Sequence, residues 1–113
     1  MENIVKQNLL YDFYGELLME HQRSVYEDVV FHDMSLGEIA EERGISRQGV
    51  SDLVRRCDKI LTGYEEKLHL IRKFQETKRM VAQIQTLAKE FRESRDMALI
   101  DEIGRISDDI TEL

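Results

Sequence analysis

The sequence has no proline, no tryptophan, a single cysteine and only six glycines in 113 residues. A chain of average composition and this length would contain about five or six prolines. Because proline breaks helices, its absence favours long uninterrupted ones and predicts an all-α fold. The lone Cys57 allows no internal disulfide, which agrees with a reducing compartment, so we expect a cytoplasmic protein.

Long hydrophobic runs are also missing. The longest run is the four residues from Met97 to Ile100, whereas a membrane-spanning helix needs about 20 apolar residues and a secretory signal at least about seven. We therefore expect neither membrane insertion nor an export signal. The hydrophobic fraction of 42% is enough for one small core.

The charge is predominantly negative. The chain carries 16 Lys and Arg against 23 Asp and Glu, a net charge of −7, so its average field repels polyanions. Residues 43–59 depart from this average, with five basic and two acidic side chains and a local charge of +3. Any contact with phosphate groups must therefore come from a local basic surface of this kind.

A helix-turn-helix pattern covers about residues 35–56. Ser35 and Glu38 have the spacing of a capping box, and Ser46 can cap a second helix. Between them, small Ala40 lets two helices approach closely, and Gly44 can adopt the left-handed conformation that a tight turn requires. The pattern predicts a helix-turn-helix domain at residues 1–62 and a C-terminal helical extension at residues 63–113.

The outward positions of the second helix are candidates for nucleic-acid contact, because such a helix enters the major groove of DNA. An arginine there can pair with guanine and a glutamine with adenine. The predicted contact residues are Arg47, Gln48, Ser51, Arg55, Arg56 and Lys59. A plain helical hairpin has the same apolar pattern, however, and Asp52 would repel phosphate, so a protein-interaction adaptor that does not bind DNA is the alternative.

A second basic run lies downstream of the motif. It comprises Lys67, Arg72, Lys73, Lys78 and Arg79, and it could follow the backbone of a structured RNA. The alternative is a solvated helix face whose lysines balance neighbouring glutamates.

The extension carries two apolar stripes, with a break or bend predicted before it at Thr62-Gly63 and a helix cap at Ser94. Because one small core cannot bury both stripes, we expect a homodimer formed through the extension.

Other chemistry finds little support in the sequence. The three histidines form no recognisable metal pair, Asp28 and His32 at a spacing of four residues are one weak match, and Cys57 lies on an apolar stripe, as a buried thiol would. No glycine-rich phosphate loop is present, and no acid, base and nucleophile can be assigned together. We expect no enzymatic activity, no metal site and no cofactor.

The residues quoted so far also resemble two known groups. The stretch from Ser35 to Arg56 is similar to region 4 of bacterial sigma factors, in which a helix-turn-helix reads promoter DNA. The chain from about residue 8 to 75 resembles the YlxM family of small bacterial proteins. That likeness rests on four segments, LLYDFY at 9–14, SLGEIAEE at 35–42, SRQ at 46–48 and YEEKL at 64–68.

The resemblance to YlxM proteins implies a regulatory role in the signal recognition particle pathway, because the genes of that family lie beside the gene for the particle's GTPase. It therefore implies the particle's RNA or its GTPase as partners. The resemblance to sigma region 4 implies DNA contact through Arg47, Gln48, Ser51 and Arg55. Both resemblances imply an all-α, sigma region 4-like fold.

Overall fold

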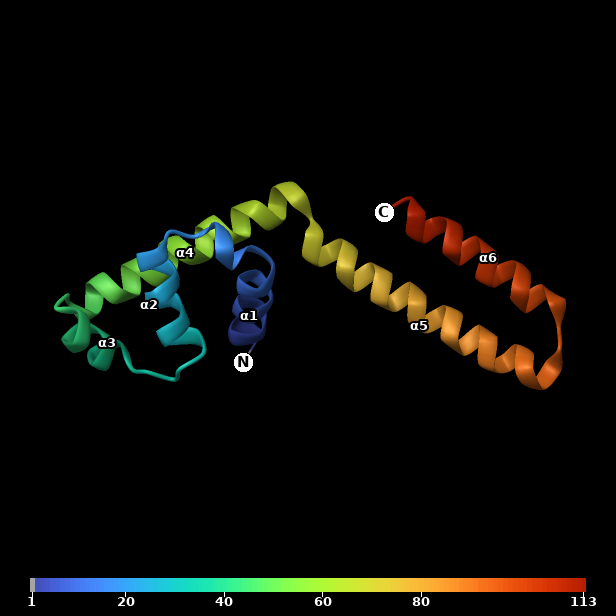
Figure 1. The fold of residues 1–113 in the computed structure, drawn as a ribbon, viewed down its shortest axis with the longest axis horizontal. Helices are drawn as coiled ribbons and strands as arrows, with labels where there is room; N and C mark the ends of the chain where they lie inside the picture. The colour runs from blue at the N-terminus through green and yellow to red at the C-terminus, as the bar shows by residue number, and fades with distance from the viewer. Residues whose placement is uncertain (1) are drawn as a thin grey trace. The chain divides into compact units, whose positions relative to one another are not determined.

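The computed structural model describes the backbone of residues 2–113 and the side chains from residue 4 onward. This part of the chain is helical and contains no strand, which confirms the predicted all-α class (Figure 1). The elements are α1 (Glu2–Tyr14), the 3-10 helix η1 (Gly15–Leu17), α2 (Glu20–Val30), α3 (Leu36–Arg43), α4 (Arg47–Leu68), α5 (Leu70–Ser94) and α6 (Met97–Thr111). The chain forms two compact units, Met1–Ile71 and Arg72–Leu113.

In the first unit, α4 packs against α1, α2 and α3 (Figure 1). Most of the buried side chains come from these four helices, with Leu18 after η1 and Ile71 at the start of α5, and together they form one apolar cluster because each helix turns its apolar stripe toward the others. Its members are Leu10, Tyr14, Leu18, Val25, Tyr26, Ile39, Ala40, Val50, Leu53, Cys57, Leu61 and Ile71. Cys57 is fully buried, as predicted, and burial raises the pKa of its thiol to about 11.

A polar contact at the edge of this core joins three helices. The Tyr26 hydroxyl of α2 donates a hydrogen bond to Asp58 Oδ1 of α4 at 2.6 Å. The Gln7 amide of α1 donates to the same carboxylate, at 3.1 Å to Oδ2. Burial and the adjacent Asp58 raise the pKa of Tyr26, so the hydroxyl stays protonated and remains a donor.

The predicted break at Thr62-Gly63 is wrong, because α4 continues through both residues and ends at Leu68. His69 then adopts a left-handed conformation, with φ of 56°. Glu65 Oε1 accepts hydrogen bonds from the Tyr14 hydroxyl at 2.5 Å and from the backbone N–H of Ile71 at 3.0 Å. These contacts attach the first residues of α5 to the core of the first unit, which ends at Ile71.

The second unit consists of the rest of α5 and the antiparallel α6 (Figure 1). Arg95 makes the corner between them in a left-handed conformation with φ of 59°. The predicted cap at Ser94 is wrong by two residues, since Asp96 is the N-cap and accepts a hydrogen bond from the backbone N–H of Ala98 at 2.9 Å. No side chain of α6 is buried.

Candidate nucleic-acid interface

The turn between α3 and α4 has the predicted construction. Ser35 and Glu38 each accept a hydrogen bond from the other's backbone N–H, at 3.1 Å in both cases. Gly44 ends α3 with φ of 68°, and Ser46 accepts from the N–H of Gly49 at 2.9 Å to start α4. Ile39 and Val50 are fully buried between the helices, so the angle between α3 and α4 is fixed by packing as well as by caps.

The six predicted contact residues lie on one side of α4. Counting about 100° per residue along a helix, they fall within about half of its circumference, opposite the buried residues Val50, Leu53 and Cys57. Five of the six are exposed and Ser51 is half-buried. We call this surface the α4 basic face, defined by Arg47, Gln48, Ser51, Arg55, Arg56 and Lys59.

Asp52 lies within the α4 basic face and contacts two of its members. Its Oδ1 accepts a hydrogen bond from the Gln48 amide at 2.9 Å and forms a close ion pair with the Arg55 guanidinium. The contacts with Gln48 and Arg55 lower the pKa of Asp52, so the carboxylate is charged at neutral pH. The face therefore carries four cations and one anion, a local charge of +3.

The remaining cations of the face have different surroundings. The Arg47 guanidinium lies against Gly37 of α3, where a Cβ atom would come within 2.9 Å of its Nη2. Because Gly37 has no side chain, the Arg47 side chain can lie against α3 at this position. Arg56 and Lys59 have no hydrogen-bond or ion-pair partner among the described residues, and with Asp52 and Arg55 they line a shallow hollow.

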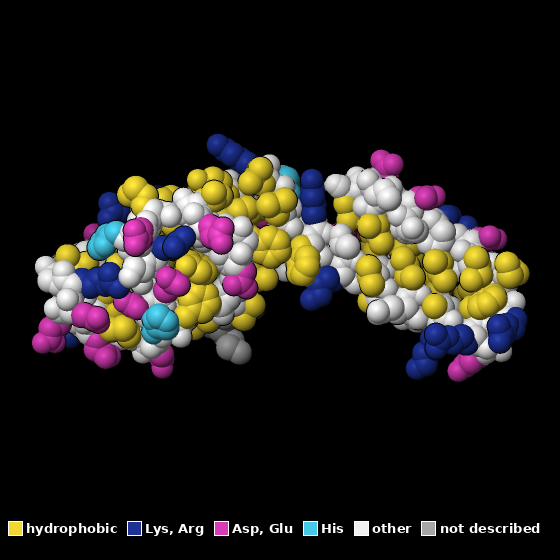
Figure 2. Space-filling model, in the orientation of Figure 1, with side chains coloured by type: hydrophobic (Ala, Val, Ile, Leu, Met, Phe, Trp, Pro, Cys, Tyr) yellow, Lys and Arg dark blue, Asp and Glu magenta, His cyan; other side chains and the backbone are white. Residues whose placement is uncertain are grey.

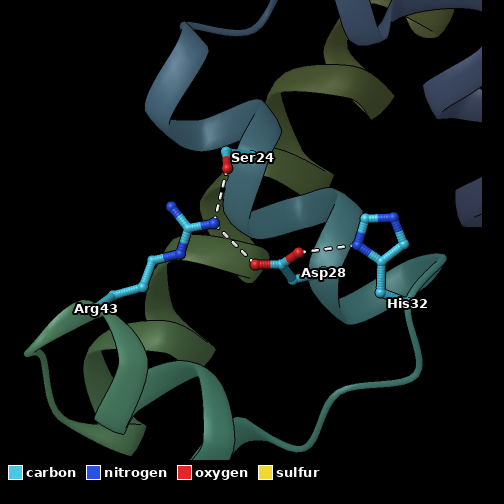
Figure 3. Close-up of polar contacts among 4 residues, drawn as sticks. All are labelled: Ser24, Asp28, His32 and Arg43. Atoms are coloured by element: carbon cyan, nitrogen blue, oxygen red, sulfur yellow. Dashed lines mark hydrogen bonds and ion pairs between the residues drawn. The ribbon is translucent and has the colours of Figure 1, made fainter.

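Arg43, which contributes to the local positive charge of the sequence, faces α2 instead of the α4 basic face. Its Nη2 donates to Ser24 Oγ at 2.7 Å and to Asp28 Oδ2 at 2.8 Å (Figure 3). The Nδ1 atom of His32 lies 2.9 Å from Asp28 Oδ1. These contacts, with His32 and then Arg43 as the main causes, lower the pKa of Asp28. Arg43 is therefore a structural link between α2 and α3.

The second basic run does not gather on one helix face. Lys67 lies on α4 and the other four on α5, where Lys73 and Lys78 are about 140° apart around the helix axis. Arg79 forms a close ion pair with Glu76, and the ammonium of Lys78 lies 5.3 Å from the centre of the Phe74 ring. Arg72 and Arg79 alone project in nearly the same direction, seven residues apart.

Among the side chains that the structure describes, from residue 4 onward, no three or more His, Cys, Asp or Glu form a cluster that could hold a metal ion. Asp28 and His32 contact each other, but the other charged side chain that contacts the Asp28 carboxylate is the cation Arg43. No helix in the described range is long and apolar enough to cross a bilayer.

Known proteins are similar in sequence to this chain over most of its length. A family model described as "Putative helix-turn-helix protein, YlxM / p13 like" matches residues 1–103. UPF0122 proteins of Bacillus cereus (strain AH187), Bacillus anthracis (strain A0248) and Bacillus thuringiensis subsp. konkukian (strain 97-27) are each 47% identical over 90 residues, which covers 80% of this chain and 82% of theirs. The predicted family is confirmed: the chain belongs to the UPF0122 family of YlxM/p13-like helix-turn-helix proteins.

Proposed function

We propose that this chain is a regulatory nucleic-acid-binding protein that contacts duplex DNA through the α4 basic face. The observation that carries the proposal is the placement of four exposed cations, an amide and a hydroxyl on one side of the helix that follows the turn. That helix is the one that enters the major groove in helix-turn-helix proteins. On a chain with a net charge of −7, the net +3 of this face attracts phosphate only locally.

The test is a titration of the full chain with duplex DNA at several salt concentrations. Binding through phosphate contacts gives a logarithm of the association constant that falls linearly with the logarithm of the salt concentration. Arg55→Ala should weaken binding and reduce the slope by about one. The matched control is Arg105→Ala on α6, which removes the same charge from an exposed position outside the face.

Asp52 provides a variant of opposite sign. Asp52→Asn removes the anion that contacts Gln48 and Arg55, so it should strengthen DNA binding and steepen the salt dependence. Glu66→Gln, at an exposed position about 20 Å further along α4, makes the same change in net charge beyond the end of the α4 basic face. Equal effects of Arg55→Ala and Arg105→Ala, or of Asp52→Asn and Glu66→Gln, would contradict the assignment of the face.

A protein-interaction adaptor is the second candidate function, and the outer surface of α3 favours it. Glu38, Glu41 and Glu42 are all exposed there. The first helix of a helix-turn-helix crosses the DNA backbone, where carboxylates repel phosphate. A basic protein surface would instead be attracted to them.

The likeness to YlxM proteins supports the signal recognition particle's RNA and its GTPase as the first alternative ligands to test. Salt-sensitive capture of the GTPase, with no measurable binding to DNA or to the RNA, would replace the nucleic-acid proposal by the adaptor. Binding to the RNA that Arg55→Ala leaves unchanged would direct attention to Arg72 and Arg79 on α5.

A further inference from the structure

The second unit leaves much of its apolar surface uncovered. The α6 residues Leu99, Ile103, Ile106 and Ile110 recur at alternating spacings of four and three, as in a coiled-coil seam, yet all four remain half-buried. Beside the seams, Val81 of α5 and Ile100 of α6 are 40% and 39% exposed. Figure 2 shows hydrophobic side chains in a continuous band along this hairpin.

The two exposed residues Val81 and Ile100 lie on the same face of the hairpin. The half-buried residues Met80, Ile84, Leu87 and Phe91 form the apolar stripe of α5. Val81 follows Met80, and Ile100 follows Leu99 of the α6 stripe, so each lies about 100° beyond its stripe. Because the helices are antiparallel, equal rotations bring these two flanks to the same side. The opposite side contains an open groove of about 510 Å³, in which Ala82, Leu87 and Ile106 lie beside polar and charged side chains.

The charges of the two helices are complementary. The α5 helix has six Lys and Arg against three Glu, a net charge of +3, while α6 has one Arg against four Asp and Glu, a net charge of −3. Next to the apolar face, helical spacing places Lys89 and Arg92 on the outer flank of α5 and Asp101 and Asp108 on that of α6. A copy of the same hairpin therefore offers an acidic flank to α5 and a basic flank to α6.

We propose that a second copy of this chain covers this face and forms a four-helix bundle in which α5 of each copy lies beside α6 of the other. A two-fold axis parallel to the helices makes every neighbouring pair antiparallel and of opposite charge. The bundle buries Val81 and Ile100. A single hairpin leaves both exposed, because each of its helices packs against only one other helix. The inference does not depend on the nucleic-acid proposal, since no residue of the α4 basic face takes part.

Sedimentation equilibrium of the full chain at micromolar concentration tests the proposal. We expect a species of twice 13.3 kDa. Ile100→Glu places a carboxylate within the covered face, near the corner of the hairpin at Arg95, and should weaken association by more than about tenfold. The matched control is Ile60→Glu on α4, which changes an isoleucine of similar exposure (37%) outside the hairpin and should leave the dimer intact.

A charge exchange distinguishes loss of the interface from loss of folding. Asp101→Lys and Lys89→Glu should each weaken dimerisation, and the double variant should recover it, because the pair is restored across the two-fold axis. A folded chain that sediments only as the 13.3 kDa species would overturn the proposal. Dissociation by Ile60→Glu, or a double variant no better than the single ones, would also overturn it.

Discussion

The Tyr26 hydroxyl is predicted to make a measurable contribution to stability that an equivalent hydroxyl in the same unit does not make. Tyr26→Phe keeps the fully buried ring but removes the donor to Asp58, which then retains only the hydrogen bond from Gln7. A hydrogen bond to a charged group contributes about 1.5–3 kcal/mol. Since the acceptor lies at the edge of the core and is only half-buried, we expect the free energy of unfolding to fall by about 2 kcal/mol.

Tyr64→Phe is the matched control for this substitution. The Tyr64 ring stacks on Tyr14 at 5.9 Å between centroids, and its hydroxyl has no hydrogen-bond partner among the described residues. Its removal should change the free energy of unfolding by less than about 0.5 kcal/mol. Urea unfolding followed by circular dichroism measures both variants. If Tyr26→Phe unfolds at the same urea concentration as Tyr64→Phe, the Asp58 contact does not stabilise the fold and the reasoning is refuted.

Three further predictions concern the first unit. Gly44→Ala should lower the free energy of unfolding by about 1 kcal/mol, because the φ of Gly44 is 68°. Gly63→Ala within α4 should raise the free energy of unfolding by about 0.5–1 kcal/mol. Changes of the same sign in urea unfolding of the two variants would contradict this. The pKa of Asp28 is lower in the folded state than the unfolded-state value of about 3.9, so the ionised carboxylate stabilises the fold above that pH. This stabilisation is lost as pH falls through the folded-state pKa. The difference in free energy of unfolding between the native chain and Asp28→Asn should therefore be constant near neutral pH and shrink below about pH 4. Cys57, fully buried and with a pKa of about 11, should react with a thiol reagent only as fast as the unit opens, so fast labelling of folded protein at neutral pH would disprove its burial.

Features that depend only on residues close together in the sequence could be predicted from the sequence. The caps at Ser35 and Ser46 depend on residues three positions away, and the left-handed turn at Gly44 depends on the absence of its own side chain. The side of α4 that carries Arg47 and Arg55 follows from helical periodicity alone. Each of these features is set within about one helical turn, so no knowledge of distant contacts was needed.

Features that depend on distant residues could not be predicted in this way. Gly63 costs a helix only about 1 kcal/mol, so whether α4 stops there is decided by packing around Leu61 and by the Tyr14 contact to Glu65. The sequence by itself determined the helices, their caps and the basic side of α4. Only the tertiary structure decided that Arg43 binds α2, because its partner Asp28 lies 15 residues away and is brought to it by the packing of α2 and α3.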